Sequence, residues 1–83
     1  MVITDAKKLV GKVCAIEWMN RSGEEMRAIS KIHDATYVPL YGGFLITDTE
    51  DVRLDRVIEI QVVSDDGSLV PVYAARRQEP VAA

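Results

Sequence analysis

A chain of 83 residues with a formal net charge of −3 is long enough for one small domain and too short for two. The acidic balance disfavours a general phosphate-binding surface, which carries an excess of lysine and arginine, but it suits a basic protein partner. One cysteine excludes a disulfide framework and a thiolate metal cage within one chain. No apolar run is long enough for a signal peptide or a membrane span, so we expect a cytoplasmic location.

The first predicted element is a short helix over residues 5–10. Thr4 is placed to cap its N-terminus, and Gly11 is placed to end it. Few apolar side chains are available to dock this helix on the rest of the domain.

A strand is predicted over residues 12–19. Cys14, Ile16 and Trp18 alternate with residues of the other face, which is the spacing of a strand with one side buried. We expect these three to point inward, which makes Trp18 a core residue. The alternative is that Trp18 forms a stacking platform for a base or another ligand.

The composition of residues 20–23 predicts a hairpin turn, with Gly23 free to take a positive φ. The return strand is expected over residues 24–32. Only one of its faces is partly apolar, so it should be exposed on the other side.

Residues 33–43 are predicted to be irregular, because proline and glycines interrupt the pattern there. Four residues that are too apolar for a free loop are expected to cap one open end of a barrel: Tyr37, Val38, Leu40 and Tyr41. His33 is predicted to be a surface or loop residue, because no metal ligands or catalytic partners are apparent around it.

The stretch from Phe44 to Val63 carries the strongest strand pattern, and the rest of the chain should pack on it. A strand over residues 44–47 leads into an acidic turn, and a second strand includes Val52 and Leu54. The pattern changes phase at Asp55 and Arg56. We interpret this step as a tight turn into the next strand, which reaches Val63.

A second hairpin turn is predicted over residues 64–68, followed by a last strand over residues 69–73. Pro71 lacks an amide donor, which places this strand at an edge or at a break in the pairing. We therefore expect a single domain over residues 1–73 and a flexible tail over residues 74–83.

These elements predict a mostly β fold, namely a small SH3-like or Sm-like antiparallel barrel of about five strands with a short N-terminal helix. The sequence has no phosphate-binding glycine loop and no recognisable catalytic serine, histidine and acid set. We therefore expect a protein that is not an enzyme and that uses no cofactor and no metal.

Part of the chain resembles the WYL domain, an Sm-like barrel that senses ligands in bacterial transcription regulators. Four segments carry the resemblance: Ile16 to Trp18, Asn20 to Glu24, Gly42 to Ile46, and Arg53 to Val57. Its most specific part is the step from Leu54 to Arg56. The tryptophan and tyrosine positions that name the family hold Gly43 and Phe44 here, and Leu45 matches.

A second resemblance is to the small bacterial modulators of Rho-dependent transcription termination (Rof), which are stand-alone acidic Sm-like barrels of similar size. It rests on the turn from Arg21 to Glu24 and on the strand from Val52 to Val57. Both resemblances imply regulation of bacterial transcription, the first through a ligand and the second through contact with a protein.

Two sets of candidate site residues follow. The acidic residues of two turns are candidates for binding a basic protein surface, such as part of the transcription machinery: Asp48, Glu50, Asp51, Asp65 and Asp66. Four others are candidates either for contacting a ligand or for a structural turn: Trp18, Arg53, Asp55 and Arg56. The predicted function is a non-enzymatic regulatory binding module. The alternatives are a WYL-like ligand sensor and an Sm-like RNA-binding protein, with nucleic acid the less favoured partner.

Overall fold

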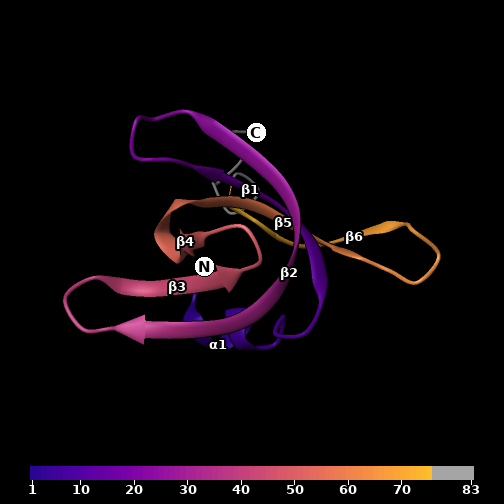
Figure 1. The fold of residues 1–83 in the computed structure, drawn as a ribbon, viewed down its shortest axis with the longest axis horizontal. Helices are drawn as coiled ribbons and strands as arrows, with labels where there is room; N and C mark the ends of the chain where they lie inside the picture. The colour runs from indigo at the N-terminus through magenta and orange to yellow at the C-terminus, as the bar shows by residue number, and fades with distance from the viewer. Residues whose placement is uncertain (76–83) are drawn as a thin grey trace, which may run out of the picture.

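The computed structural model describes residues 1–75, which form one short helix and one antiparallel sheet of six strands (Figure 1). In chain order the elements are α1 (Ile3–Lys7), β1 (Val13–Met19), β2 (Glu25–Val38), β3 (Gly42–Thr47), β4 (Asp51–Arg53), the 3-10 helix η1 (Leu54–Arg56), β5 (Val57–Val63) and β6 (Leu69–Ala74). The strands lie in the order β4-β3-β2-β1-β5-β6. The prediction of a mostly β fold with a short N-terminal helix is therefore confirmed.

Strand β2 joins two halves of the sheet, one containing β1, β5 and β6 and the other containing β3 and β4. Figure 1 shows β2 curving from one half into the other. Its first part pairs with β1, and its second part pairs with β3. The register shifts between Ile32 and Asp34, so the inward residues Ile32 and Ala35 are three positions apart instead of two. This bulge breaks the alternation ahead of Pro39 and the two glycines. Our prediction of an irregular segment beginning at His33 was wrong, because β2 continues to Val38 and β3 begins at Gly42.

A tight turn at residues 39–41 connects β2 to β3, and Leu40 has a positive φ of 77°. The expected capping role for the apolar residues here is also wrong. Tyr37 and Tyr41 are more than 60% exposed and Leu40 is fully exposed, so the end of this hairpin projects into solvent.

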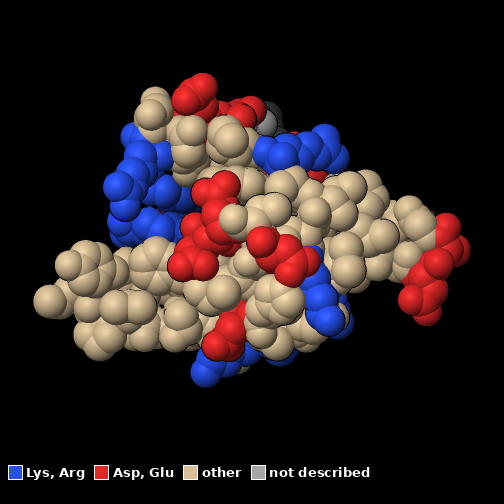
Figure 2. All heavy atoms as spheres, viewed as in Figure 1, with Lys and Arg blue, Asp and Glu red and all other residues tan. Residues whose placement is uncertain are grey.

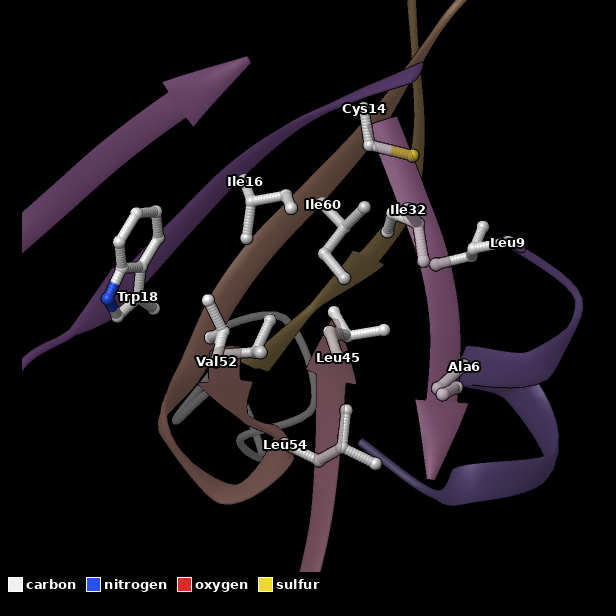
Figure 3. Packing of buried hydrophobic residues seen from close by; sticks show 12 residues of the cluster. Ala6, Leu9, Cys14, Ile16, Trp18, Ile32, Leu45, Val52, Leu54 and Ile60 are labelled. Carbon is white, nitrogen blue, oxygen red and sulfur yellow. The ribbon is translucent and has the colours of Figure 1, made fainter. Parts of the chain in front are cut away.

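The core lies on the concave side of the sheet, where side chains from both halves meet (Figure 3). The buried residues come from every element except β6: Ala6, Leu9, Cys14, Ile16, Trp18, Ile32, Ala35, Leu45, Val52, Leu54, Val57 and Ile60. The prediction that Cys14, Ile16 and Trp18 face inward is confirmed. Burial raises the pKa of the Cys14 thiol, which keeps it protonated and makes it a packing residue.

Helix α1 covers one side of this core and is shorter than predicted. It starts after Val2 without a side-chain cap, so the predicted cap at Thr4 is wrong. The helix ends at Lys7 with Lys8 as its C-cap, so Gly11 does not end it as predicted. Gly11 instead closes the following turn with a positive φ of 87°, and its N–H donates to the Ile32 carbonyl over 2.7 Å. This bond fixes the entry to β1 against the middle of β2.

The predicted strand, turn and strand between Val52 and Val63 are present as β4, η1 and β5. The turn begins one residue earlier than predicted, so Leu54 lies in η1 and not in the strand, and it is buried. Within residues 1–75 the sheet does not close, because β4 and β6 form its two edges. Pro71 lies in the edge strand β6, as expected. Ala74 belongs to β6 and not to the predicted tail, and most of that tail, residues 76–83, lies outside the described residues.

Candidate functional site

A groove of about 560 Å³ lies between the turn that joins β1 to β2 and the segment formed by β4 and η1. Its walls come from four separate parts of the chain: Trp18, Met19, Asn20, Arg21 and Ser22; Tyr41 and Phe44; Glu50, Asp51, Val52 and Arg53; and Arg56. Figure 2 shows basic atoms gathered below the end of the β1–β2 hairpin, with the apolar end of the β2–β3 hairpin beneath them.

Three aromatic side chains line this groove. Trp18 is 6% exposed and belongs to both the core and the groove. Phe44 is half-buried, and Tyr41 stands at the rim with 64% of its surface exposed. The groove therefore offers apolar ring surface at several depths, which suits a partner that buries an apolar side chain.

Arg53 lies opposite Phe44 in the pairing of β3 with β4. Its Nη2 donates to a carboxylate oxygen of Asp55 over 3.0 Å. Its Nε is buried and has no hydrogen-bond partner within residues 1–75. One N–H of Arg53 is thus satisfied by Asp55, whereas its buried Nε–H has no acceptor within residues 1–75.

Arg56 connects η1 to the β1–β2 turn, because its Nη1 donates to the Asn20 carbonyl over 3.1 Å. The nearby carboxylates have other partners, because Asp55 pairs with Arg53 and Glu17 pairs with Arg27. Since a carbonyl carries no net charge, the positive charge of Arg56 is not neutralised by this contact.

Asn20 shapes the β1–β2 turn that carries Arg21. Its side-chain oxygen accepts the N–H groups of Ser22 and Glu24, each over 2.9 Å. Gly23 takes a φ of 83°, which confirms the predicted turn. Arg21 is exposed at this turn and lines the groove, and it was not among the predicted site residues.

The acidic turn between β3 and β4 is divided between the groove and the neighbouring strand. Glu50 and Asp51 line the groove. Asp48 instead hydrogen-bonds to His33 of β2 and accepts the Lys31 N–H over 3.4 Å. The bond to His33 is the main cause that lowers the pKa of Asp48.

The other acidic turn, which carries Asp65 and Asp66, lies at the outer end of the β5–β6 hairpin. In Figure 2 the acidic atoms at this end stand apart from those near the centre of the molecule. The two turns join strand pairs at opposite edges of the sheet. The five candidate acidic residues therefore do not form one patch.

The structure thus brings together residues from both candidate sets. Trp18, Arg53 and Arg56 share the groove with Glu50 and Asp51, and Asp55 contributes through its bond to Arg53. Tyr41, Phe44 and Arg21 were missed. Arg21 lies in the β1–β2 turn and Tyr41 in the β2–β3 turn, and the composition of these turns was the only hint in the sequence that the two residues are exposed. That they border one groove follows only from the pairing of the strands.

Within residues 1–75, no cluster of three or more histidine, cysteine, aspartate or glutamate side chains is arranged to hold a metal ion. The same part of the chain contains no helix with the length and hydrophobicity needed to cross a membrane. Comparisons with protein-family models, with curated proteins and with solved structures found no match. The two family resemblances therefore stay predictions.

Proposed function

We propose that this chain is a small non-enzymatic protein-binding module that holds a segment of its partner in the groove. The single observation that carries the proposal is the composition of the groove walls. Aromatic rings, three arginines and two acidic residues converge there from four separate parts of the chain. Apolar anchors with flanking charges of both signs match the side chains of a polypeptide.

The two carboxylates in the groove favour a protein over a nucleic acid. Glu50 and Asp51 would face the phosphates of a bound strand, and the whole chain is acidic. A nucleic-acid site usually presents a continuous basic surface, because each phosphate contact depends on lysine or arginine. RNA binding is accordingly the alternative that this groove supports least.

A ligand-sensing role is the second candidate, and one feature favours it. Arg53 lines the groove and its side chain is 41% exposed, so an anionic small molecule could bind its guanidinium group. The alternative acceptor is a carboxylate or carbonyl of a partner protein. Both kinds of ligand would use the same arginine, and the experiment below separates them.

The proposal also includes the class of fold to which the curved sheet belongs. A small SH3-like or Sm-like barrel is supported by the bent β2, which pairs with β1 in one half of the sheet and with β3 in the other. The two halves enclose a common core. A regulatory role in bacterial transcription rests on the resemblances of the segments around Arg21 and Leu54.

The test is photo-crosslinking from inside and outside the groove. A photoreactive phenylalanine analogue replaces Tyr41 at the groove rim or, as the control, Val70, which is 49% exposed on β6. We expect the Tyr41 position to capture one segment of a protein in native extract, with or without nuclease, and the Val70 position not to capture it.

The captured segment is then made as a synthetic peptide and titrated by calorimetry. Arg21→Ala should weaken its binding about tenfold, which corresponds to about 1.4 kcal/mol. Arg27→Ala, an exposed arginine outside the groove, should leave the affinity unchanged. Equal affinities for both variants would refute the groove as the site. Capture of RNA, or of a small molecule that competes with the peptide, would favour the corresponding alternative.

A further inference from the structure

We propose that the groove orients its partner segment by charge. An acidic side chain binds at the Arg21 and Arg56 end, a basic side chain binds at the Glu50 and Asp51 end, and an apolar side chain lies between them on Trp18 and Phe44. This inference rests on the proposed function, because it describes which peptides the protein-binding groove accepts.

The positive end of the groove consists of Arg56 and Arg21. Arg56 is held against the Asn20 carbonyl, and Arg21 follows Asn20 in the chain, so both belong to the region of the β1–β2 turn. Arg53 adds less charge, because Asp55 pairs with it. Two guanidinium groups without a carboxylate partner in residues 1–75 are suited to binding a carboxylate.

The negative end lies at the start of β4. Thr47 fixes the turn before it, since its Oγ1 donates to the Glu50 carbonyl over 2.7 Å and accepts the Glu50 N–H over 3.2 Å. Asp51 pairs with Ile46 in the sheet, whereas Arg53 pairs with Phe44. The backbone positions of Asp51 and Arg53 are therefore separated by about 7 Å along the strand. Arg56 follows in η1, and its Nη1 lies at the Asn20 carbonyl of the β1–β2 turn.

The charges at the two ends of the groove do not pair with each other. Within residues 1–75, no ion pair joins Glu50 or Asp51 to an arginine of the groove. In Figure 2 the basic atoms gather toward the side of the β1–β2 hairpin end, and acidic atoms lie closer to the centre of the molecule. A ligand of a single charge sign would be attracted at one end and repelled at the other, which is a basis for selectivity.

The spacing of the two ends sets the spacing of the ligand charges. An extended peptide advances about 3.3 Å per residue, so an acidic and a basic residue two to four positions apart would reach both ends. The residues between them would face the aromatic side chains. Because an extended peptide can bind in either direction, the inference concerns mixed charge and spacing and not the order of the two charges.

The experiment uses four synthetic peptides with capped ends and the full chain labelled with nitrogen-15. The mixed peptide contains glutamate, leucine, tyrosine and lysine in that order. In two further peptides glutamine replaces either the glutamate or the lysine, and in the fourth it replaces both. Titrations followed by NMR are expected to shift groove amides, with the mixed peptide binding several-fold more tightly than the others.

Protein variants assign each peptide charge to one end of the groove. Arg21→Gln should reduce the preference for the peptide glutamate, because only Arg56 then remains at that end, and should keep the preference for the lysine. Glu50→Gln should do the reverse, because only Asp51 then remains at the other end. Arg27→Gln and Asp65→Asn, which lie outside the groove, should change neither preference.

Two results would overturn the inference. If the peptides shift groove amides but all four bind equally, recognition by mixed charge is wrong while the protein-binding groove stands. If none of them shifts groove amides at millimolar concentration, the inference is also wrong, and the crosslinking experiment alone then decides the proposed function.

Discussion

The two acidic turns of this protein have similar compositions but obtain their hydrogen-bond partners from different parts of the chain. In the β5–β6 turn, Asp66 accepts the Ser64 and Ser68 hydroxyls, each over 2.7 Å, and the Ser68 N–H over 3.0 Å. In the β3–β4 turn, Asp48 is bonded to His33 and Lys31 of β2, and its own N–H donates to the Ser30 hydroxyl over 3.0 Å.

This difference shows that acidic residues in a turn do not by themselves mark a binding surface. The three donors to Asp66 lie within two residues of it. Holding the turn is therefore enough to explain an aspartate at this position, without a role in binding. The β3–β4 turn has local bonds from Thr47 as well, but its Asp48 is also bonded to another strand, and the turn delivers Glu50 and Asp51 to the groove. The proposed site therefore depends on tertiary structure, whereas the β5–β6 turn depends mainly on local sequence.

The largest expected effect comes from removing the core anchor on the groove side. Leu54 in η1 is 3% exposed, and Leu54→Ala should lower the free energy of unfolding by about 2–4 kcal/mol by opening a cavity. Val70→Ala on the exposed β6 should cost at most about 0.5 kcal/mol. Urea denaturation of both variants tests this, and an unchanged midpoint for Leu54→Ala would contradict the contrast.

A smaller effect is expected from Gly43→Ala, which probes how closely β3 packs on η1. A Cβ at this position would lie 2.5 Å from Leu54 Cδ1, and buried Leu54 has little room to move away. The overpacking should cost about 1–3 kcal/mol. In the double variant with Leu54→Ala that clash is removed, so the two costs should be less than additive. Strict additivity in urea denaturation would show that the two residues do not meet.

Asp66→Asn should reduce the acid dependence of stability without affecting the groove. The bonds from Ser68 and Ser64 hold the pKa of Asp66 at about 2, below its ordinary value of 3.8. A depressed pKa in the folded state stabilises the protein above pH 4, and this contribution is lost as the pH falls from about 4 to about 2.

Urea denaturation across this pH range should therefore show a weaker pH dependence for Asp66→Asn than for the wild type. Asp65→Asn is the matched control, because Asp65 makes none of these bonds. If the pH profiles of Asp66→Asn and the wild type coincide, the carboxylate does not hold the turn.

The features predicted correctly from the sequence depend on near neighbours in the chain. Gly23 and Gly67 adopt the positive φ that their turns require, and the inward face of β1 follows directly from its alternation. The turn at Asp55 and Arg56 was visible as a change of phase, and it is present as η1.

The features that were missed depend on contacts between distant segments. The bulge near His33 shifts the inward positions of β2, which hid the continuation of the strand to Val38. The groove requires Phe44 and Arg53 to pair across two strands and Arg56 to reach the β1–β2 turn. No local pattern specifies these contacts, so the sequence showed several of the site residues but not the site.

The smallest expected effect, the response of Asp48 to His33→Ala, tests the contrast between the two turns most directly. Removing the imidazole removes the main cause of the lowered pKa of Asp48, so that pKa should rise toward its ordinary value. The bond from the Lys31 N–H should keep the pKa of Asp48 partly lowered.

Carboxyl carbon shifts followed by NMR across an acid titration would report Asp48 and Asp66 in the same sample. Asp66 should titrate unchanged, because its donors lie within its own turn, and Arg27→Ala should move neither pKa. An unchanged Asp48 titration in His33→Ala would mean that β2 does not hold the β3–β4 turn through this pair, and the difference between the two turns would then rest on Ser30 and Lys31 alone.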